Sequence, residues 1–147
     1  MEPSIQNFIS GKRIAVVGAS RSGKNKFGNA AAKELHARGY EIFLVHPEAK
    51  EIDGTPCYPN LAALSGKVDG VLVSVPPGQA EKVLREASAA GLLRVWLTQG
   101  AETSSLISLG KELGLELVTG KCILMYAPPV RSVHGLHRFF VKLMGQL

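Results

Sequence analysis

The sequence predicts a doubly wound α/β fold, in which helices cover both faces of a parallel sheet of about five strands. Short apolar runs rich in β-branched residues alternate along the chain with longer segments whose apolar residues have helical spacing. Glycine or proline ends nearly every one of these segments. The alternation continues through five strands, which favours parallel strands joined by right-handed crossovers.

The expected elements follow one another in a regular order. Strands are expected at 13–17, 41–45, 68–75, 94–97 and 115–118. Helices are expected at 3–9, 27–38, 77–90, 102–113 and 133–144. Between the second and third strands, a loop holds an extended piece at 55–58 and a helical turn at 60–64, for which Asn60 is the cap.

The length of 147 residues fits a single domain, with a core of about 12–122 and a C-terminal extension, 123–147, laid over it. Hydrophobic residues make up 46% and charged residues 20% of the chain, as in an ordinary soluble globule. No apolar run approaches the ~20 residues of a membrane helix, and the N-terminus does not read as a signal peptide. Two cysteines are too few for a disulfide framework. We expect a cytoplasmic protein.

The formal net charge of +5 comes from basic residues scattered along the chain, with a second group at Arg131, Arg138 and Lys142. No dense block of Lys and Arg appears, and aromatic residues are not interleaved with them. This pattern disfavours nucleic acid as a partner. A polyanionic small ligand explains the charge more economically.

The stretch 13–39 has the order of a phosphate site. An apolar strand breaks at Gly18, a polar loop carries Arg21, Lys24 and Lys26, and an alanine-rich helix ends at Gly39. Backbone N–H groups at a helix start have no partner within the helix, and the helix dipole adds partial positive charge there. The stretch therefore predicts an anion pocket, most simply for a nucleotide.

Two common nucleotide motifs fit this stretch poorly. A dinucleotide fingerprint needs G-x-G-x-x-G and an acidic residue after the second strand, whereas the glycines here are at 18, 23 and 28 and that strand ends in His46–Pro47. A P-loop would begin at Gly18, but Asn25 stands where a Ser or Thr must bind Mg²⁺. Hydrolysis of ATP or GTP is therefore disfavoured, and binding of NAD is a less favoured hypothesis.

Residues that follow the strands carry a family resemblance. They are the VVGAS loop with the later Gly28, the strand ends His46–Pro47 and Val75–Pro76, the run VWLTQGAE at 95–102, and Gly-x-Cys at 120–122. In this order the chain resembles the small proteins of the Rossmann-like CoA-binding domain family, related to the CoA-binding domain of succinyl-CoA synthetase α subunits. The likeness covers about 13–122.

The resemblance implies coenzyme A (CoA) as the ligand. It implies that Gly18, Ala19 and Ser20 lie against the diphosphate or adenosine, with Arg21 and Lys24 near the phosphates. It also implies that Pro47 borders the nucleotide, that Val75 and Pro76 border the ligand, and that Gln99 and Gly100 lie near the pantetheine arm. Because CoA carries a pyrophosphate and a separate ribose phosphate, it suits a helix start ringed by cations.

Reactive side chains are few. Cys122 follows the last strand. Its thiol could form a mixed disulfide with CoA, but a buried structural role is favoured. His46 is expected to line the pocket rather than to act as a base. His134 and His137 lack a third metal ligand, and Glu102 is expected to cap the next helix. The sequence therefore predicts a binding site with no catalytic residue and no metal.

The leading hypothesis is a protein that binds CoA or an acyl-CoA without chemistry of its own, as a sensor, carrier or regulatory partner. Two alternatives stay open. One is a CoA-dependent transferase or ligase component that works with a partner subunit, and the other is an NAD(P)-binding redox sensor. The apolar C-terminal helix, with Phe139 and Phe140, also favours a homodimer interface.

Overall fold

The computed structural model describes residues 2–19, 26–52, 54–98 and 102–128. Its helices are α1 (Pro3–Ser10), α2 (Lys26–Ala37), α3 (Pro77–Ala89) and α4 (Ser104–Glu112), with single 3-10 turns η1 (Leu61–Leu64) and η2 (Ile123–Met125). Its strands are β1 (Arg13–Val17), β2 (Glu41–Val45), β3 (Glu51–Ile52), β4 (Thr55–Tyr58), β5 (Gly70–Val73), β6 (Arg94–Leu97) and β7 (Glu116–Val118). The expected helix at 133–144 lies outside the described residues. No described helix has the length and apolar character needed to span a bilayer.

The strands form one sheet in the order β3-β4-β2-β1-β5-β6-β7. All neighbouring pairs are parallel except β3 and β4, which form an antiparallel hairpin at one edge. Without β3, the order has the 3-2-1-4-5-6 pattern of a Rossmann sheet. The α/β class and a mainly parallel sheet are confirmed, but the expected number of about five strands is wrong, since the described residues form seven. The extended piece at 55–58 joins the sheet, and β3 is too short to show a periodicity.

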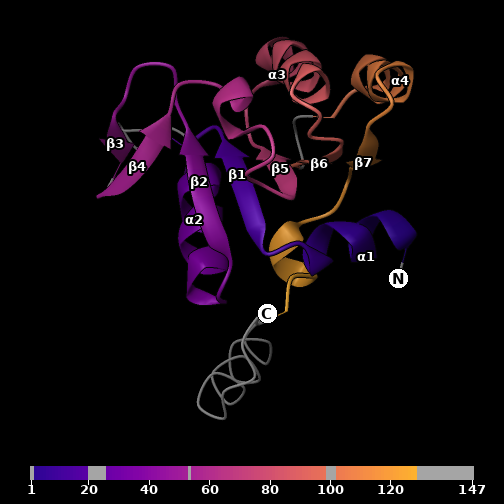
Figure 1. Cartoon of the computed structure of the whole chain (residues 1–147). Helices are drawn as coiled ribbons and strands as arrows, with labels where there is room; N and C mark the ends of the chain where they lie inside the picture. Colours follow the sequence, from indigo (N-terminus) through magenta and orange to yellow (C-terminus); the bar gives the residue numbers. More distant parts are fainter. Residues whose placement is uncertain (1, 20–25, 53, 99–101, 129–147) are drawn as a thin grey trace.

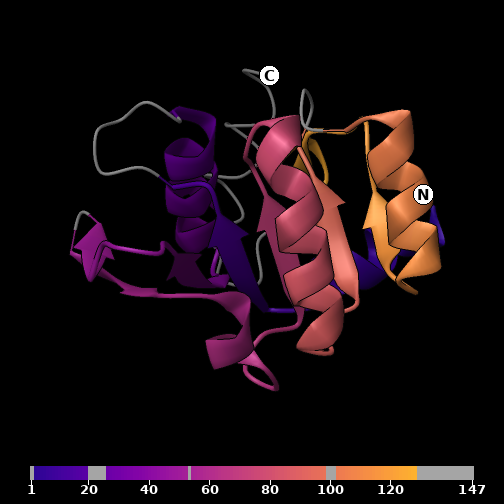
Figure 2. The ribbon, with the colours of Figure 1, turned by 90° about the horizontal axis from the view of Figure 1, so that it is seen from above.

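The two faces of the sheet carry separate hydrophobic clusters. Along β1, Ile14 and Val16 belong to the cluster with α1, α2 and η2, whereas Ala15 belongs to the cluster with η1, α3 and α4. This alternation follows from the two-residue period of a strand. Both views show α3 and α4 side by side on their face of the sheet (Figures 1 and 2).

The ends of the helices follow local chemistry. Gly39, Gly91 and Gly114 follow α2, α3 and α4 with positive φ angles, as the sequence predicts for helix-ending glycines. Asn60 caps η1 as expected, because its side-chain oxygen accepts the N–H of Ala63 at 3.0 Å. The expected cap of α4 is wrong. Thr103, not Glu102, accepts the N–H of Leu106, at 3.2 Å, since its short hydroxyl side chain reaches that group directly.

The chain after β7 packs under α2 and belongs to the core as far as Ala127. Ile123 and Ala127 are each only 1% exposed. The buried guanidinium of Arg38 donates to the carbonyl oxygens of Leu124 at 2.8 Å and Ala127 at 2.7 Å. The indole N–H of Trp96 donates to the carbonyl of Lys121 at 2.9 Å. The segment expected to begin an extension at residue 123 is thus tied to the body at several points.

Candidate functional site

The carboxyl edge of the sheet, between β1 and β5, is the candidate site. Strand order reverses there, and in open parallel sheets ligands bind in the crevice at such a reversal. The N–H of Ser74 donates to the carbonyl of Val17 at 2.8 Å, so the chain after β5 stays beside the end of β1. This contact brings Gly18 and Ala19 to the same edge as Val75 and Pro76. Those four predicted site residues are therefore gathered in one place.

Two glycines shape the turn after β1. Gly18 has a φ angle of 122°, a conformation that side chains disfavour. Gly28 is buried in the first turn of α2, where an added Cβ would lie 2.9 Å from the carbonyl oxygen of Gly18. In the dinucleotide fingerprint, one glycine makes the tight turn and another lets helix and strand pack closely. Gly18 and Gly28 do these two jobs here, although a longer loop separates them than in that motif.

Helices approach the edge from both faces. After β1, α2 begins beyond the glycine turn, and after β5, α3 begins with Pro77 at its first position. The N–H groups of a first helical turn and the helix dipole both favour negative charge. Ser20, Arg21, Lys24, Gln99 and Gly100, which the sequence also predicts for this site, lie outside the described residues.

His46, at the end of β2, organises the following turn. Its Nδ1 accepts the backbone N–H groups of Glu48 at 3.1 Å and Ala49 at 2.9 Å, and the backbone N–H of His46 donates to the carbonyl of Tyr58 at 2.9 Å. Because Nδ1 is an acceptor, the ring proton of the neutral imidazole is on Nε2. The geometry therefore favours a role for His46 in holding the turn that bears the exposed Pro47.

Two further polar groups lie after the strands. Cys122 is a half-buried free thiol in the segment that Trp96 ties down. Glu102 follows the β6 loop and precedes α4, and its Oε2 atom is buried without a hydrogen-bond partner. Within the described ranges no other side-chain nitrogen or oxygen is in that state, and no group of three metal-ligating side chains occurs. An unpartnered buried carboxylate oxygen is costly, so this atom calls for a donor beyond those of the described residues.

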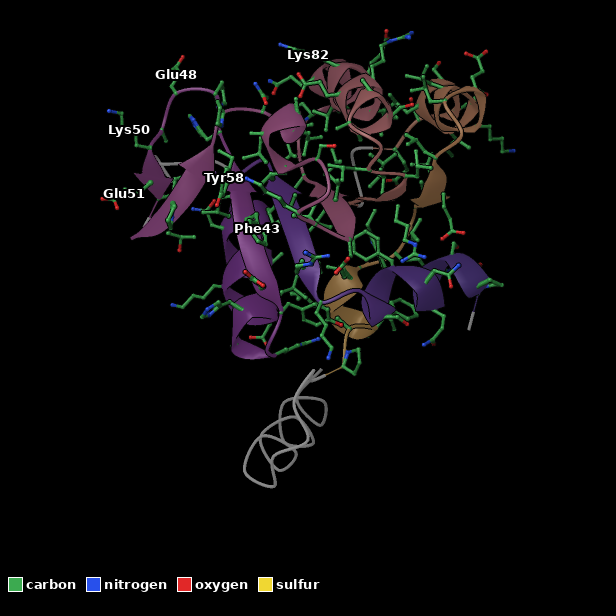
Figure 3. All side chains as sticks on the ribbon, in the orientation of Figure 1. Phe43, Glu48, Lys50, Glu51, Tyr58 and Lys82 are labelled. Atoms are coloured by element: carbon green, nitrogen blue, oxygen red, sulfur yellow. The ribbon has the colours of Figure 1, made fainter. Side chains whose placement is uncertain are left out.

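Sequence reasoning missed a large groove beside α2. Its volume is about 1180 Å³, and it runs between α2 and the strands β2, β3 and β4. Glu48, Lys50 and Glu51 point outward from the hairpin side of the molecule (Figure 3), whereas Ile52 is buried and faces the groove. The sequence did contain a sign of this groove. The connection 46–54, with Pro47 and Gly54, is too short to hold a crossover helix.

Comparison with known proteins gives this arrangement a family. Residues 12–128 match the family model of the CoA binding domain. The chain belongs to the CoA-binding domain family. The resemblance predicted from the strand-end residues is thereby confirmed, and the match runs six residues past the 122 at which the likeness was expected to end.

Curated relatives carry this domain as part of longer proteins. The chain is 27% identical over 122 residues to "Acetate--CoA ligase [ADP-forming] I" of Archaeoglobus fulgidus, covering 76% of this chain and 18% of that protein. It is 24% identical over 127 residues to "Acetate--CoA ligase [ADP-forming] II subunit alpha" of Pyrococcus furiosus, covering 79% of this chain and 28% of that protein. This chain thus spans less than a third of the length of either curated relative.

Solved structures of similar size share the fold. A conserved hypothetical protein from Pyrococcus furiosus is 34% identical with a TM-score of 0.72, over 77% of this chain and 97% of that one. A hypothetical protein from Pyrococcus horikoshii OT3 is 25% identical with a TM-score of 0.73, over 93% of this chain and 89% of that one. The fold therefore also occurs in chains that the match spans nearly whole.

Proposed function

We propose that this protein binds CoA or an acyl-CoA at the carboxyl edge between β1 and β5. The observation that carries the proposal is the close approach of Gly28 to the carbonyl of Gly18, at the point where strand order reverses. This approach brings the start of α2 against the turn after β1. Membership of the CoA-binding domain family supports CoA as the ligand for such an edge.

The residues at this edge suit the chemistry of CoA. The pyrophosphate would lie against the Gly18 turn and the start of α2, where Arg21 and Lys24 of the intervening loop bring full positive charges. The pantetheine arm carries amide N–H groups, and the unpartnered Oε2 of Glu102 is an acceptor suited to one of them. His46 would hold the turn that borders the nucleotide.

The proposed role is binding without catalysis, as a sensor, a carrier or a regulatory partner. The described carboxyl edge offers a cradle of glycines and backbone groups rather than a nucleophile with an adjacent base. His46, a candidate base at the end of β2, has its Nδ1 engaged by two N–H groups.

A second candidate is a CoA ligase component that works with a partner chain. The curated relatives favour it, because their names assign acetate–CoA ligase activity and one of them is a subunit. The parts of those relatives that this chain does not span would then come from another protein. Formation of acetyl-CoA from acetate, ATP and CoA only when a purified candidate partner is added would support this role. Unchanged inactivity of every such mixture would argue against it.

Calorimetric titration of the full chain with CoA tests the proposed site. Gly28→Ala places a methyl group against the Gly18 carbonyl, so we expect CoA affinity to fall about tenfold or more, which is roughly 1.4 kcal/mol. Gly70→Ala is the matched control, since its Cβ would meet the Phe8 ring at 2.7 Å, at the opposite end of the sheet. It should lower the melting temperature without lowering the affinity.

Two outcomes would overturn the proposal. One is equal affinity loss in both glycine variants, which would mean that stability rather than the site was tested. The other is saturable binding of NADPH with none of CoA, which would assign the edge to a dinucleotide. Alanine substitution of Arg21 and Lys24 should weaken CoA binding and reduce its dependence on salt.

A further inference from the structure

Among the described residues, one flank of the sheet lacks the helix that its topology calls for. In this sheet α2 joins β1 to β2, α3 joins β5 to β6, and α4 joins β6 to β7. The connection from β2 to β4 holds the two-residue strand β3 instead. Parallel sheets normally have helices over both faces. Beside α2, the face of β2 and β4 therefore has no second helix among the described residues.

The opposite face of the same flank is covered. Phe43 of β2 and Tyr58 of β4 lie together there (Figure 3), with ring centroids 5.8 Å apart, and η1 packs against β4. The uncovered part is thus confined to the side of α2, where the groove lies. The groove is therefore a local gap in a sheet whose other parts have covering elements.

The dimensions of the groove suit a helix. It runs along α2 from Ala19 near the carboxyl edge to Gly39 at the other end of that helix. The twelve residues of α2 make this about 18 Å, and the volume of about 1180 Å³ exceeds the roughly 300–1,000 Å³ of small-molecule pockets. Ala30 and Ala37 line the helix side, and such short side chains let a second helix approach closely.

The end of the described chain lies near this groove. Arg38 holds the carbonyl of Ala127, and Gly39, the next residue after Arg38, lines the groove. Figure 1 shows that the described chain ends at the level of the C-terminal end of α2. Residues 128–132 can span roughly 17 Å when extended, which is more than the about 10–12 Å diameter of a helix. The chain beyond them can therefore pass the end of α2 and enter the groove.

The sequence of the following segment matches the gap. Residues 133–144 number twelve, as many as α2, and place Val133, Leu136, Phe140 and Leu143 on one helical face. Cationic side chains such as Arg138 fall on the opposite face. An amphipathic helix of this kind has an apolar side that needs a partner surface.

We propose that residues 133–144 form a helix that lies in the groove alongside α2 and covers β2 and β4. It takes the place of the crossover helix that the 46–54 connection lacks. The floor offered to its apolar face includes Ile42, Leu44 and Ile52. This proposal does not depend on the binding of CoA.

Hydrogen exchange of the full chain tests the proposed position of residues 133–144. The variant carries both Leu136→Asp and Phe140→Asp, and the control carries His134→Asp. The double variant should speed amide exchange about tenfold or more in 133–144 and also along 41–45 and 51–58, whereas α3 and α4 should be unchanged. The control substitutes the polar face and should leave both regions as they are. A reciprocal variant, Ala30→Arg, fills the groove from α2 and should release 133–144, whereas Ala89→Arg on the exposed end of α3 should not.

Unchanged exchange in 41–45 and 51–58 in the double variant would overturn the proposal. Protection of 133–144 that grows with protein concentration, together with a dimer in sedimentation, would also overturn it and assign the segment to a second copy.

Discussion

The two faces of the sheet are held in different ways. On the face of α3 and α4, the covering elements follow one another along the chain, and apolar side chains such as Leu84, Val95 and Leu106 form the cluster. The side-chain bonds to carbonyls on this face, from Ser65 to Ala90 and from Ser88 to Leu113, come from half-buried or exposed serines. On the face of α1 and α2, the covering segments come from opposite ends of the chain and meet through hydrogen bonds to backbone carbonyls. Arg38 reaches Ala127, Tyr40 reaches Ile9, and Trp96 reaches Lys121.

The difference shows how one sheet combines two kinds of stabilisation. Packing by consecutive crossovers is built from local connections, so it should be lost only when the whole domain unfolds. Contacts between distant segments depend on a few directional bonds, so they can open separately. Both the candidate site and the groove involve α2, which lies on this second face.

The largest effect is expected on the packed face. Leu84 is fully buried between α3 and the sheet, so Leu84→Ala should lower the free energy of unfolding by about 2–5 kcal/mol. Chemical denaturation should stay a single transition. A separate early transition confined to α3 and α4 would show that this face does not unfold together with the whole domain.

A smaller and local effect is expected at Arg38, which is 4% exposed. The Nη1 atom of Arg38 binds both carbonyls while its Nε binds Glu34. The single nitrogen of a lysine cannot reach both places at once, so Arg38→Lys should cost about 2 kcal/mol. Exchange at 123–127 should rise before global unfolding. Arg85→Lys is the control, since Arg85 pairs with Glu81 four residues away, as Arg38 does with Glu34, but is largely exposed. An equal cost in both variants would mean that the two carbonyl contacts contribute nothing.

The smallest effect is expected at Tyr40, whose hydroxyl donates to the Ile9 carbonyl at 2.9 Å. Tyr40→Phe should cost about 1 kcal/mol. Burial raises the pKa of Tyr40 from 10.0 to about 12, and the charge of Arg38 only partly offsets this. The folded state thus favours the neutral phenol, so this contribution is complete below pH 10 and is lost as the pH rises to about 12. Denaturation midpoints between these pH values should fall more steeply in the wild type than in the variant.

Local patterns predicted much of the fold. Strands 13–17, 41–45 and 94–97 and the Asn60 cap are as expected, because each is bounded by residues with strong local preferences. The hairpin strand β3 was missed because two residues carry no periodicity. The bond from Arg38 to Ala127 joins residues 89 positions apart, a pairing that no local pattern encodes.

The candidate site was predicted in outline. The position of Gly18 after the first strand is readable in the sequence, and Gly28 follows from the family resemblance. Its physical reason, contact with the Gly18 carbonyl, appears only in three dimensions. Neither the unpartnered oxygen of Glu102 nor the groove beside α2 follows from the sequence, since both arise where separate elements meet.

Binding of CoA at the carboxyl edge can be followed directly by nuclear magnetic resonance titration of the full chain with CoA, observed at the backbone amides. We expect saturable shifts that centre on Gly18, Ala19, Val75 and Glu102 at the carboxyl edge, with little change at Arg13, Glu41 and Arg94, where the strands begin. Shifts centred on the starts of the strands, or none at saturating CoA, would contradict binding at this edge.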